Sequence, residues 1–167
     1  GMPGMPGGMP DMSNIGEMLF PMLDKDKDGK LSMAEYQTMA SLMGGMCLQK
    51  ALGGAHAMAT PLGELHLHHG TLLGILLPHI LLFNKGYADA ELDDLRHAMG
   101  VPLATDLDDW MTGFVASIGL PTTLSTLGVQ QAALPSIAEK AARDHLSATN
   151  PRPADARDYL QLLSDAM

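Results

Sequence analysis

The sequence is poor in cysteine and in aromatic residues, and it lacks a long apolar run. A single cysteine, Cys47, excludes an internal disulfide framework, and its apolar neighbours favour a small buried side chain over a reactive thiol. Aromatic residues make up only 4% of the chain, so the core must be built from Leu, Ala, Met and Ile, which favours helix over sheet. The longest apolar segment, residues 71–83, is too short to span a bilayer and contains Pro78 and His79, so we interpret it as a buried core helix.

Basic residues are scarce as well. Ten Lys and Arg face 19 Asp and Glu, and the resulting net charge of −9 argues against binding to nucleic acid or to an anionic membrane. No basic segment followed by an apolar run opens the sequence, so no secretory signal is visible and we expect a cytoplasmic protein. The 167 residues, 46% of them hydrophobic, are enough for one medium domain with a small appendage.

The chain divides into three predicted parts. Residues 1–12 are rich in Gly, Pro and Met and predict a tail, residues 13–43 a helix–loop–helix motif, and residues 39–167 a helical domain. No segment alternates with period two for long enough to predict a strand. The fold class expected is therefore all-α, a bundle-like domain of several helices. Capping signals and apolar spacing predict helices over 13–23, 32–52, 71–83, 88–99, 106–118, 135–146 and 155–166.

The segment Asp24–Glu35, DKDKDGKLSMAE, matches the twelve-residue EF-hand calcium loop at every demanding position. Gly29 stands where the chain must turn sharply. Calcium prefers six to eight oxygen ligands, which this array supplies. The predicted ligands are Asp24, Asp26, Asp28, Lys30 through its carbonyl group, Ser32 and Glu35.

Leu31 occupies the position at which EF-hands place an apolar residue that pairs with a second loop. Because only one such loop is present, we expect weak calcium binding that pairing across a dimer would tighten. A homo-oligomer, formed through this pairing or through an exposed apolar face, is the partner expected besides the calcium ion.

Five of the seven histidines lie between Ala51 and Asn84. His56 and His69 are separated by a segment with proline and glycine, which predicts that they come from two successive helices and form half of a metal site. Two ligands are too few for tight binding. Glu64, His66 and His68 are close enough in sequence to complete a local site, although an exposed polar loop is the alternative interpretation.

This part of the chain resembles the C-terminal helical domain of the iron-containing (group III) alcohol dehydrogenases, from about Met39 to Met167. No single motif is decisive, but several occur in the right order. The matching segments are 53–59 (GGAHAMA), 61–63 (PLG), 68–71 (HHGT), 76–79 (LLPH), 83–84 (FN), 119–121 (GLP), 127–129 (LGV) and 149–153 (TNPRP).

The resemblance implies that His56 and His69 are ligands of the iron or zinc ion that polarises the substrate oxygen during hydride transfer. It also implies that an N-terminal α/β domain normally supplies the NAD(P) site and two further ligands, an Asp and a His. Thr60 departs from the family pattern, because many members carry a histidine four residues after the first ligand. No G-x-G-x-x-G phosphate loop occurs in the sequence.

Two functions follow from these patterns. The first is a calcium-binding EF-hand fused to a truncated, catalytically incompetent domain of the dehydrogenase type. The second is an NAD(P)- and metal-dependent alcohol or aldehyde oxidoreductase, or a fragment of one, whose nucleotide comes from a missing domain or a partner chain. The first is favoured because hydride transfer needs a nicotinamide held at a fixed position, and the sequence offers no evident place for it.

Overall fold

The computed structural model describes residues 24, 26–30, 32–34, 52–102 and 104–167. The chain divides into two compact units, residues 1–50 and residues 51–167. The predictions for the helix over 13–23, for Leu31, for Glu35 and for Cys47 lie outside the described residues. Of the helix predicted over 32–52, four residues are described. Met33 and Ala34 are helical, whereas Ser32 and Leu52 are not.

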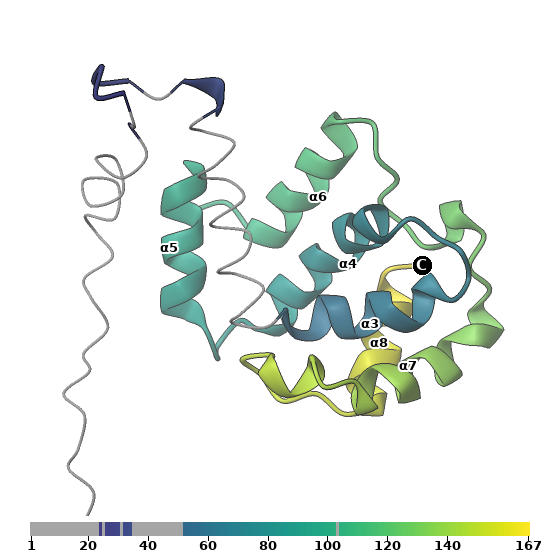
Figure 1. Ribbon diagram of the computed structural model, residues 1–167. Coiled ribbons are helices and arrows are strands. Elements are labelled where there is room, and N and C mark those ends of the chain that lie inside the picture. Colours follow the sequence, from purple (N-terminus) through teal and green to yellow (C-terminus); the bar gives the residue numbers. More distant parts are fainter. Residues whose placement is uncertain (1–23, 25, 31, 35–51, 103) are drawn as a thin grey trace, which may run out of the picture. The chain divides into compact units, whose positions relative to one another are not determined.

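The second unit is built from helices alone, and no strand occurs among the described residues, which confirms the all-α prediction (Figure 1). Six α-helices are joined by loops and three short 3₁₀ helices. The α-helices are α3 (Gly53–Gly63), α4 (His69–Phe83), α5 (Asp89–Met99), α6 (Leu107–Ser117), α7 (Leu134–Arg143) and α8 (Ala156–Asp165). The 3₁₀ helices are η2 (Ser125–Leu127), η3 (Gln131–Ala133) and η4 (Ser147–Thr149).

Helices α3 and α4 lie at the centre of this unit. Helix α3 packs against α4, α7 and η4, helix α4 also packs against α6 and α8, and α7 packs against α8 (Figure 1). The main core between them is almost entirely aliphatic, as the composition predicts, and its one buried aromatic residue is Tyr159. The largest fully buried side chains are Tyr159, Met58, Leu62, Leu72, Ile75, Leu76, Leu107, Leu124, Leu134 and Leu163.

Capping residues fix the ends of several helices where the sequence predicts them. Gly100 ends α5 with a left-handed backbone (φ 67°), a conformation that glycine adopts at little cost. Asp155 and Asp158 form a capping box at the start of α8. Helix α7 ends three residues earlier than predicted, because Asp144 leaves the helical conformation and its carboxylate accepts a hydrogen bond from the Leu146 amide (2.9 Å).

Within the described residues, no helix is long and apolar enough to cross a membrane.

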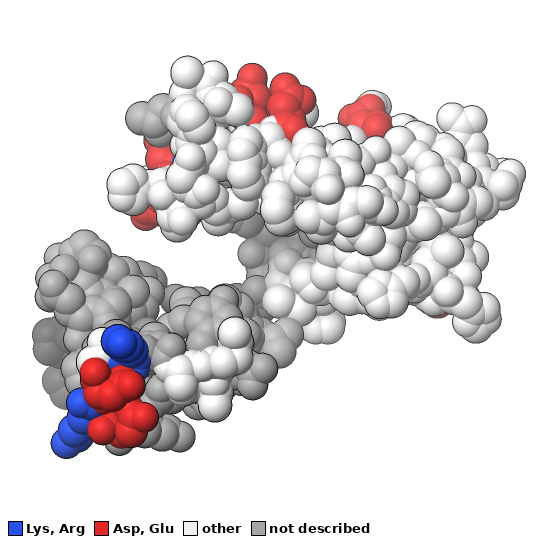
Figure 2. All heavy atoms as spheres, turned by 90° about the horizontal axis from the view of Figure 1, so that it is seen from above, with Lys and Arg blue, Asp and Glu red and all other residues white. Residues whose placement is uncertain are grey.

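Large apolar side chains are exposed toward the end of α6, where Phe114 is 45% and Ile118 55% accessible. On the face shown in Figure 2, most of the visible surface of residues 52–167 is uncharged. Self-association through an exposed apolar face stays a prediction.

Candidate metal centre

The first turns of α3 and α4 bring two imidazoles together. His56 lies in the first turn of α3, His69 is the first residue of α4, and their ring centroids are 5.2 Å apart with the planes tilted by 54°. The prediction that the pair comes from successive helices is confirmed. The break lies further along the chain than the proline suggests, since α3 runs through Pro61 to Gly63 before a loop over residues 64–68 returns to α4.

The environment of His56 favours the neutral ring. Partial burial lowers the pKa of His56 most, the neighbouring His69 lowers it further, and a hydrogen bond from the ring to the Leu52 carbonyl opposes both effects. A neutral imidazole has a free lone pair and is the form that binds metals. His56 also lines a mostly apolar hollow of about 380 Å³ between α3, α4 and the segment 149–151.

The ring spacing fits a shared ion. An ion bound at about 2.1 Å by one nitrogen of each imidazole would hold the two ring centroids roughly 5 Å apart at a tetrahedral angle. The observed 5.2 Å agrees with that separation. His56 and His69 could therefore supply two nitrogen ligands to a divalent iron or zinc ion, and further ligands would have to come from other residues.

The neighbouring polar residues do not complete this site within the described structure. The Nδ1 atom of His68 accepts a hydrogen bond from the Thr71 amide (3.3 Å) and so caps α4. His66 is exposed and has a left-handed backbone (φ 60°) in the turn after α3. Glu64 forms an ion pair with Lys140. The exposed polar loop is thus the interpretation that the structure supports.

The acidic loop near the N-terminus gathers three carboxylates. Oxygen atoms of Asp24, Asp26 and Asp28 lie within 4.8 Å of one another. The Asp28 amide donates to Asp24 Oδ1 (3.1 Å) and the Gly29 amide to Asp24 Oδ2 (3.0 Å). Gly29 adopts the left-handed conformation (φ 78°) that the sequence predicts for the sharp turn. Among the other predicted calcium ligands, Lys30 and Ser32 are described and exposed, whereas Glu35 lies outside the described residues.

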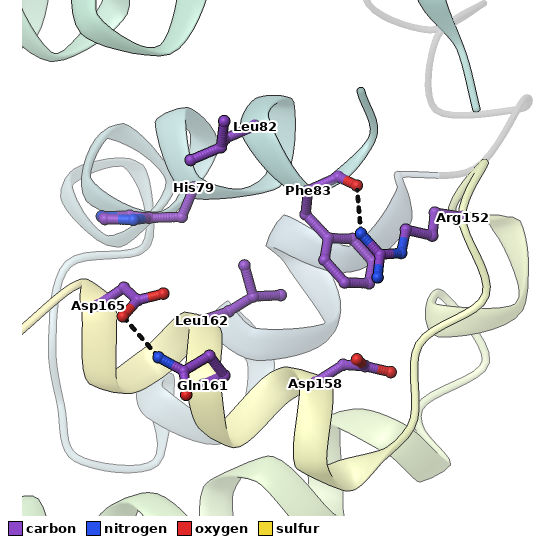
Figure 3. A pocket seen from close by; sticks show the side chains of 8 residues that line it. All are labelled: His79, Leu82, Phe83, Arg152, Asp158, Gln161, Leu162 and Asp165. Atoms are coloured by element: carbon purple, nitrogen blue, oxygen red, sulfur yellow. Dashed lines mark hydrogen bonds between the residues drawn. The ribbon is translucent and has the colours of Figure 1, made fainter. Parts of the chain in front are cut away.

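A second hollow, of about 290 Å³, lies between α4 and α8 (Figure 3). His79 reaches it from α4, and Asp165, which accepts a hydrogen bond from Gln161 (2.7 Å), faces it from α8. Burial lowers the pKa of His79, while the carboxylates of Asp165 and Asp108 oppose that shift.

Acid should destabilise the fold partly through His79. Because the pKa of His79 is lower in the folded protein than in the unfolded chain, the unfolded chain binds a proton at this residue first. The free energy of unfolding should therefore fall as the pH drops below about 6.5, the ordinary pKa of histidine. The fall should end below the pKa of His79 in the folded protein. Denaturant unfolding between pH 7.5 and 5 measures this slope. His79→Gln should make the slope shallower and Leu82→Ala, an exposed neighbour on α4, should not. Equal slopes in all three proteins would contradict the assignment.

Comparison with known proteins shows the family of this chain. The family model described as "Fe-containing alcohol dehydrogenase family, C-terminal" matches residues 9–167. The chain belongs to this family. The match begins 30 residues before Met39, where the resemblance was expected to begin, and therefore includes the acidic loop. The resemblance of the helical domain to the iron-containing alcohol dehydrogenases is confirmed.

Several relatives of this Fe-containing alcohol dehydrogenase domain are oxidoreductases by name. The 4-hydroxybutyrate dehydrogenase of Cupriavidus necator is 35% identical over 153 residues, which cover 86% of this chain and 39% of that protein. The 1,3-propanediol dehydrogenase of Citrobacter freundii is 32% identical over 146 residues, covering 81% and 38%. The lactaldehyde reductase of Escherichia coli K12 is 29% identical over 153 residues, covering 86% and 38%. The chain thus spans about two fifths of the length of these relatives.

Solved structures in the family share the fold of this domain. A crystal structure of 1,3-propanediol oxidoreductase superimposes with a TM-score of 0.65 at 30% identity, covering 70% of this chain and 33% of that chain. The alcohol dehydrogenase from Oenococcus oeni superimposes with a TM-score of 0.64 at 25% identity, covering the same shares.

Proposed function

We propose that this domain supplies His56 and His69 as two ligands of a divalent iron or zinc ion in an NAD(P)-dependent alcohol or aldehyde oxidoreductase. The observation that supports the proposal best is the 5.2 Å separation of the two rings, which come from the first turns of adjacent helices. When bound, such an ion polarises a substrate oxygen and stabilises the charge that develops on it. The partial burial of His56 keeps its ring neutral and ready to bind.

The domain alone lacks the remainder of the catalytic machinery in this proposal. The family resemblance assigns two further ligands and the nucleotide site to the N-terminal domain of its members. A nicotinamide must be held at a fixed distance and angle from the substrate, and no glycine-rich phosphate loop occurs in this sequence. We therefore expect the 167-residue chain with added zinc or iron to show no NAD(P)-dependent alcohol oxidation above that of a doubly substituted His56→Ala, His69→Ala protein.

Metal binding itself tests the proposal. Titration with Zn²⁺ by calorimetry, and with Co²⁺ by visible absorption, should reveal one site that His56→Ala and His69→Ala each weaken by about tenfold or more, which is about 1.4 kcal/mol. The titrations belong in an Asp24→Ala background, so that the acidic loop does not take up the ion. His145→Ala, which removes an exposed histidine next to Asp144, serves as the matched control and should leave the affinity unchanged. Identical titrations for the double His56/His69 variant and the parent would refute the proposed site.

We propose in addition that the acidic loop binds calcium through Asp24, Asp26, Asp28, the Lys30 carbonyl, Ser32 and Glu35. The supporting observation is the convergence of three carboxylates within 4.8 Å around a left-handed Gly29. Hard oxygen ligands in this number and spacing suit calcium better than a transition metal.

A further inference from the structure

The first turn of α3 receives its capping hydrogen bonds from a distant part of the chain. The amide of Gly53 donates to Thr149 Oγ1 (3.2 Å), and the amide of Gly54 donates to Asn150 Oδ1 (3.2 Å). The residue at the N-cap position, Leu52, has an apolar side chain and cannot accept such bonds. The first amides of a helix need an outside acceptor, so the start of α3 depends on two residues that lie 96 positions later.

Asn150 is buried and uses both ends of its side chain. Its Oδ1 atom accepts from the Gly54 amide and from Asn84 Nδ2 (3.3 Å). Its Nδ2 atom donates to Asn84 Oδ1 (2.8 Å) and to the Arg152 carbonyl (2.7 Å). Asn84 is equally buried and is the C-cap residue of α4, so one amide side chain joins the start of α3 to the end of α4. A fully satisfied buried network of this kind specifies one arrangement.

The two glycines allow this close approach. Gly53 has a left-handed backbone (φ 67°), which side chains rarely tolerate. A Cβ atom on Gly54 would lie 2.7 Å from Ile80 Cδ1 and 3.3 Å from Asn150 Oδ1. The chain therefore reaches Asn150 only because residues 53 and 54 have no side chains.

The loop that carries Asn150 makes a second contact with the end of α4, through Arg152. Arg152 donates from Nη1 to the Phe83 carbonyl (3.1 Å), and its guanidinium group lies 3.9 Å from the centre of the Phe83 ring (Figure 3). These contacts hold the backbone on the C-terminal side of Asn150. The loop that carries Asn150 is therefore attached to the end of α4 as well as to the start of α3.

His56 is the fourth residue of α3, so it directly follows Gly53, Gly54 and Ala55, which the capping bonds hold in place. We propose that Asn150 is a positioning residue for His56: by capping α3 it holds the first turn, and with it the imidazole, in the orientation that faces His69. The inference rests on the proposed metal-binding function. Residues that orient a ligand commonly change metal affinity by about 10- to 100-fold when they are removed.

Asn150→Ala, in the 167-residue chain, removes the acceptor for Gly54 and both bonds to Asn84. Ser147→Ala is the matched control, because it breaks a buried hydrogen bond from Tyr159 (2.7 Å) in the same segment and leaves the acceptors of the Gly53 and Gly54 amides in place. Circular dichroism identifies a temperature at which all the proteins are folded, and Thr149→Val replaces Asn150→Ala should the latter fail to fold.

Two measurements test whether Asn150 positions His56. Without metal, the ¹⁵N and ¹H resonances of the His56 ring should shift or broaden in Asn150→Ala and stay unchanged in Ser147→Ala. With Zn²⁺, Asn150→Ala should bind about tenfold more weakly than the parent, while Ser147→Ala binds equally well. Unchanged ring resonances and affinity in Asn150→Ala would overturn the positioning role. Absence of any His56-dependent zinc binding in the parent would refute the proposed function instead, and the ring resonances would still test the positioning role.

Discussion

Replacing Tyr159 by alanine should lower the free energy of unfolding by about 3–5 kcal/mol, the range found when large buried aromatic side chains are removed. Tyr159, the fourth residue of α8, is fully buried in the main core. Its hydroxyl donates to the Ser147 hydroxyl (2.7 Å), which is buried as well. The substitution therefore leaves both a cavity and a buried polar group without its partner. Urea unfolding followed by circular dichroism measures the loss.

Two further variants separate these contributions. Tyr159→Phe keeps the ring and should cost about 1–3 kcal/mol through the lost hydrogen bond, and it stays measurable should the alanine variant not fold. Tyr87→Ala removes a tyrosine that is 62% exposed and should change stability by less than about 0.5 kcal/mol. A loss below about 1 kcal/mol for Tyr159→Ala would mean that α8 does not pack against the core as described.

Asp24→Ala should abolish measurable calcium binding by the acidic loop. The parent chain should bind calcium with a dissociation constant of roughly 10⁻⁵ to 10⁻³ M, the weak end of the EF-hand range. Asp24 is the carboxylate at the first position, and its two oxygens accept hydrogen bonds from the amides of Asp28 and Gly29, so its loss removes a ligand and loosens the turn. Calorimetry with Ca²⁺ measures the change.

The control for the calcium experiment is Lys27→Asn. Lys27 has a left-handed backbone (φ 60°), which asparagine tolerates, and its position in the loop supplies no ligand. Glu35→Gln, which weakens the twelfth position, should behave like Asp24→Ala. Unchanged calcium binding in both ligand variants would eliminate this site. If Leu31 pairs two loops across a dimer, the affinity should rise with protein concentration, and a constant affinity would exclude that pairing.

The elements that sequence reasoning places well are those with strong local signals. Gly100 at the end of α5 and the capping box of Asp155 and Asp158 depend only on neighbouring residues, and the helices begin and end close to the expected positions. Local signals also mislead, because Pro61 suggests a break although α3 continues to Gly63. Proline has no amide hydrogen, so α3 loses one backbone hydrogen bond near its end. The packing of α3 against α4 and α7 can offset this cost.

The sequence predicts only part of the candidate metal centre. The pairing of His56 with His69 follows from the family motifs, but their separation depends on how the loop over residues 64–68 returns to α4. The role of Asn150 could not be predicted from local patterns, since its partners are Gly54 and Asn84, 96 and 66 positions away. The only signal was its place in the family-like segment TNPRP, which suggests packing and does not identify the cap.

The most direct test of the account is anomalous diffraction from crystals of this chain soaked with zinc, recorded on both sides of the zinc absorption edge. The account predicts a peak between the imidazoles of His56 and His69, within bonding distance of one nitrogen of each ring, about 2.0–2.1 Å. The peak should disappear in crystals of the His56→Ala, His69→Ala protein. Zinc bound only elsewhere, with the two rings turned away from each other, would contradict the central claim that these helices present half of a metal site.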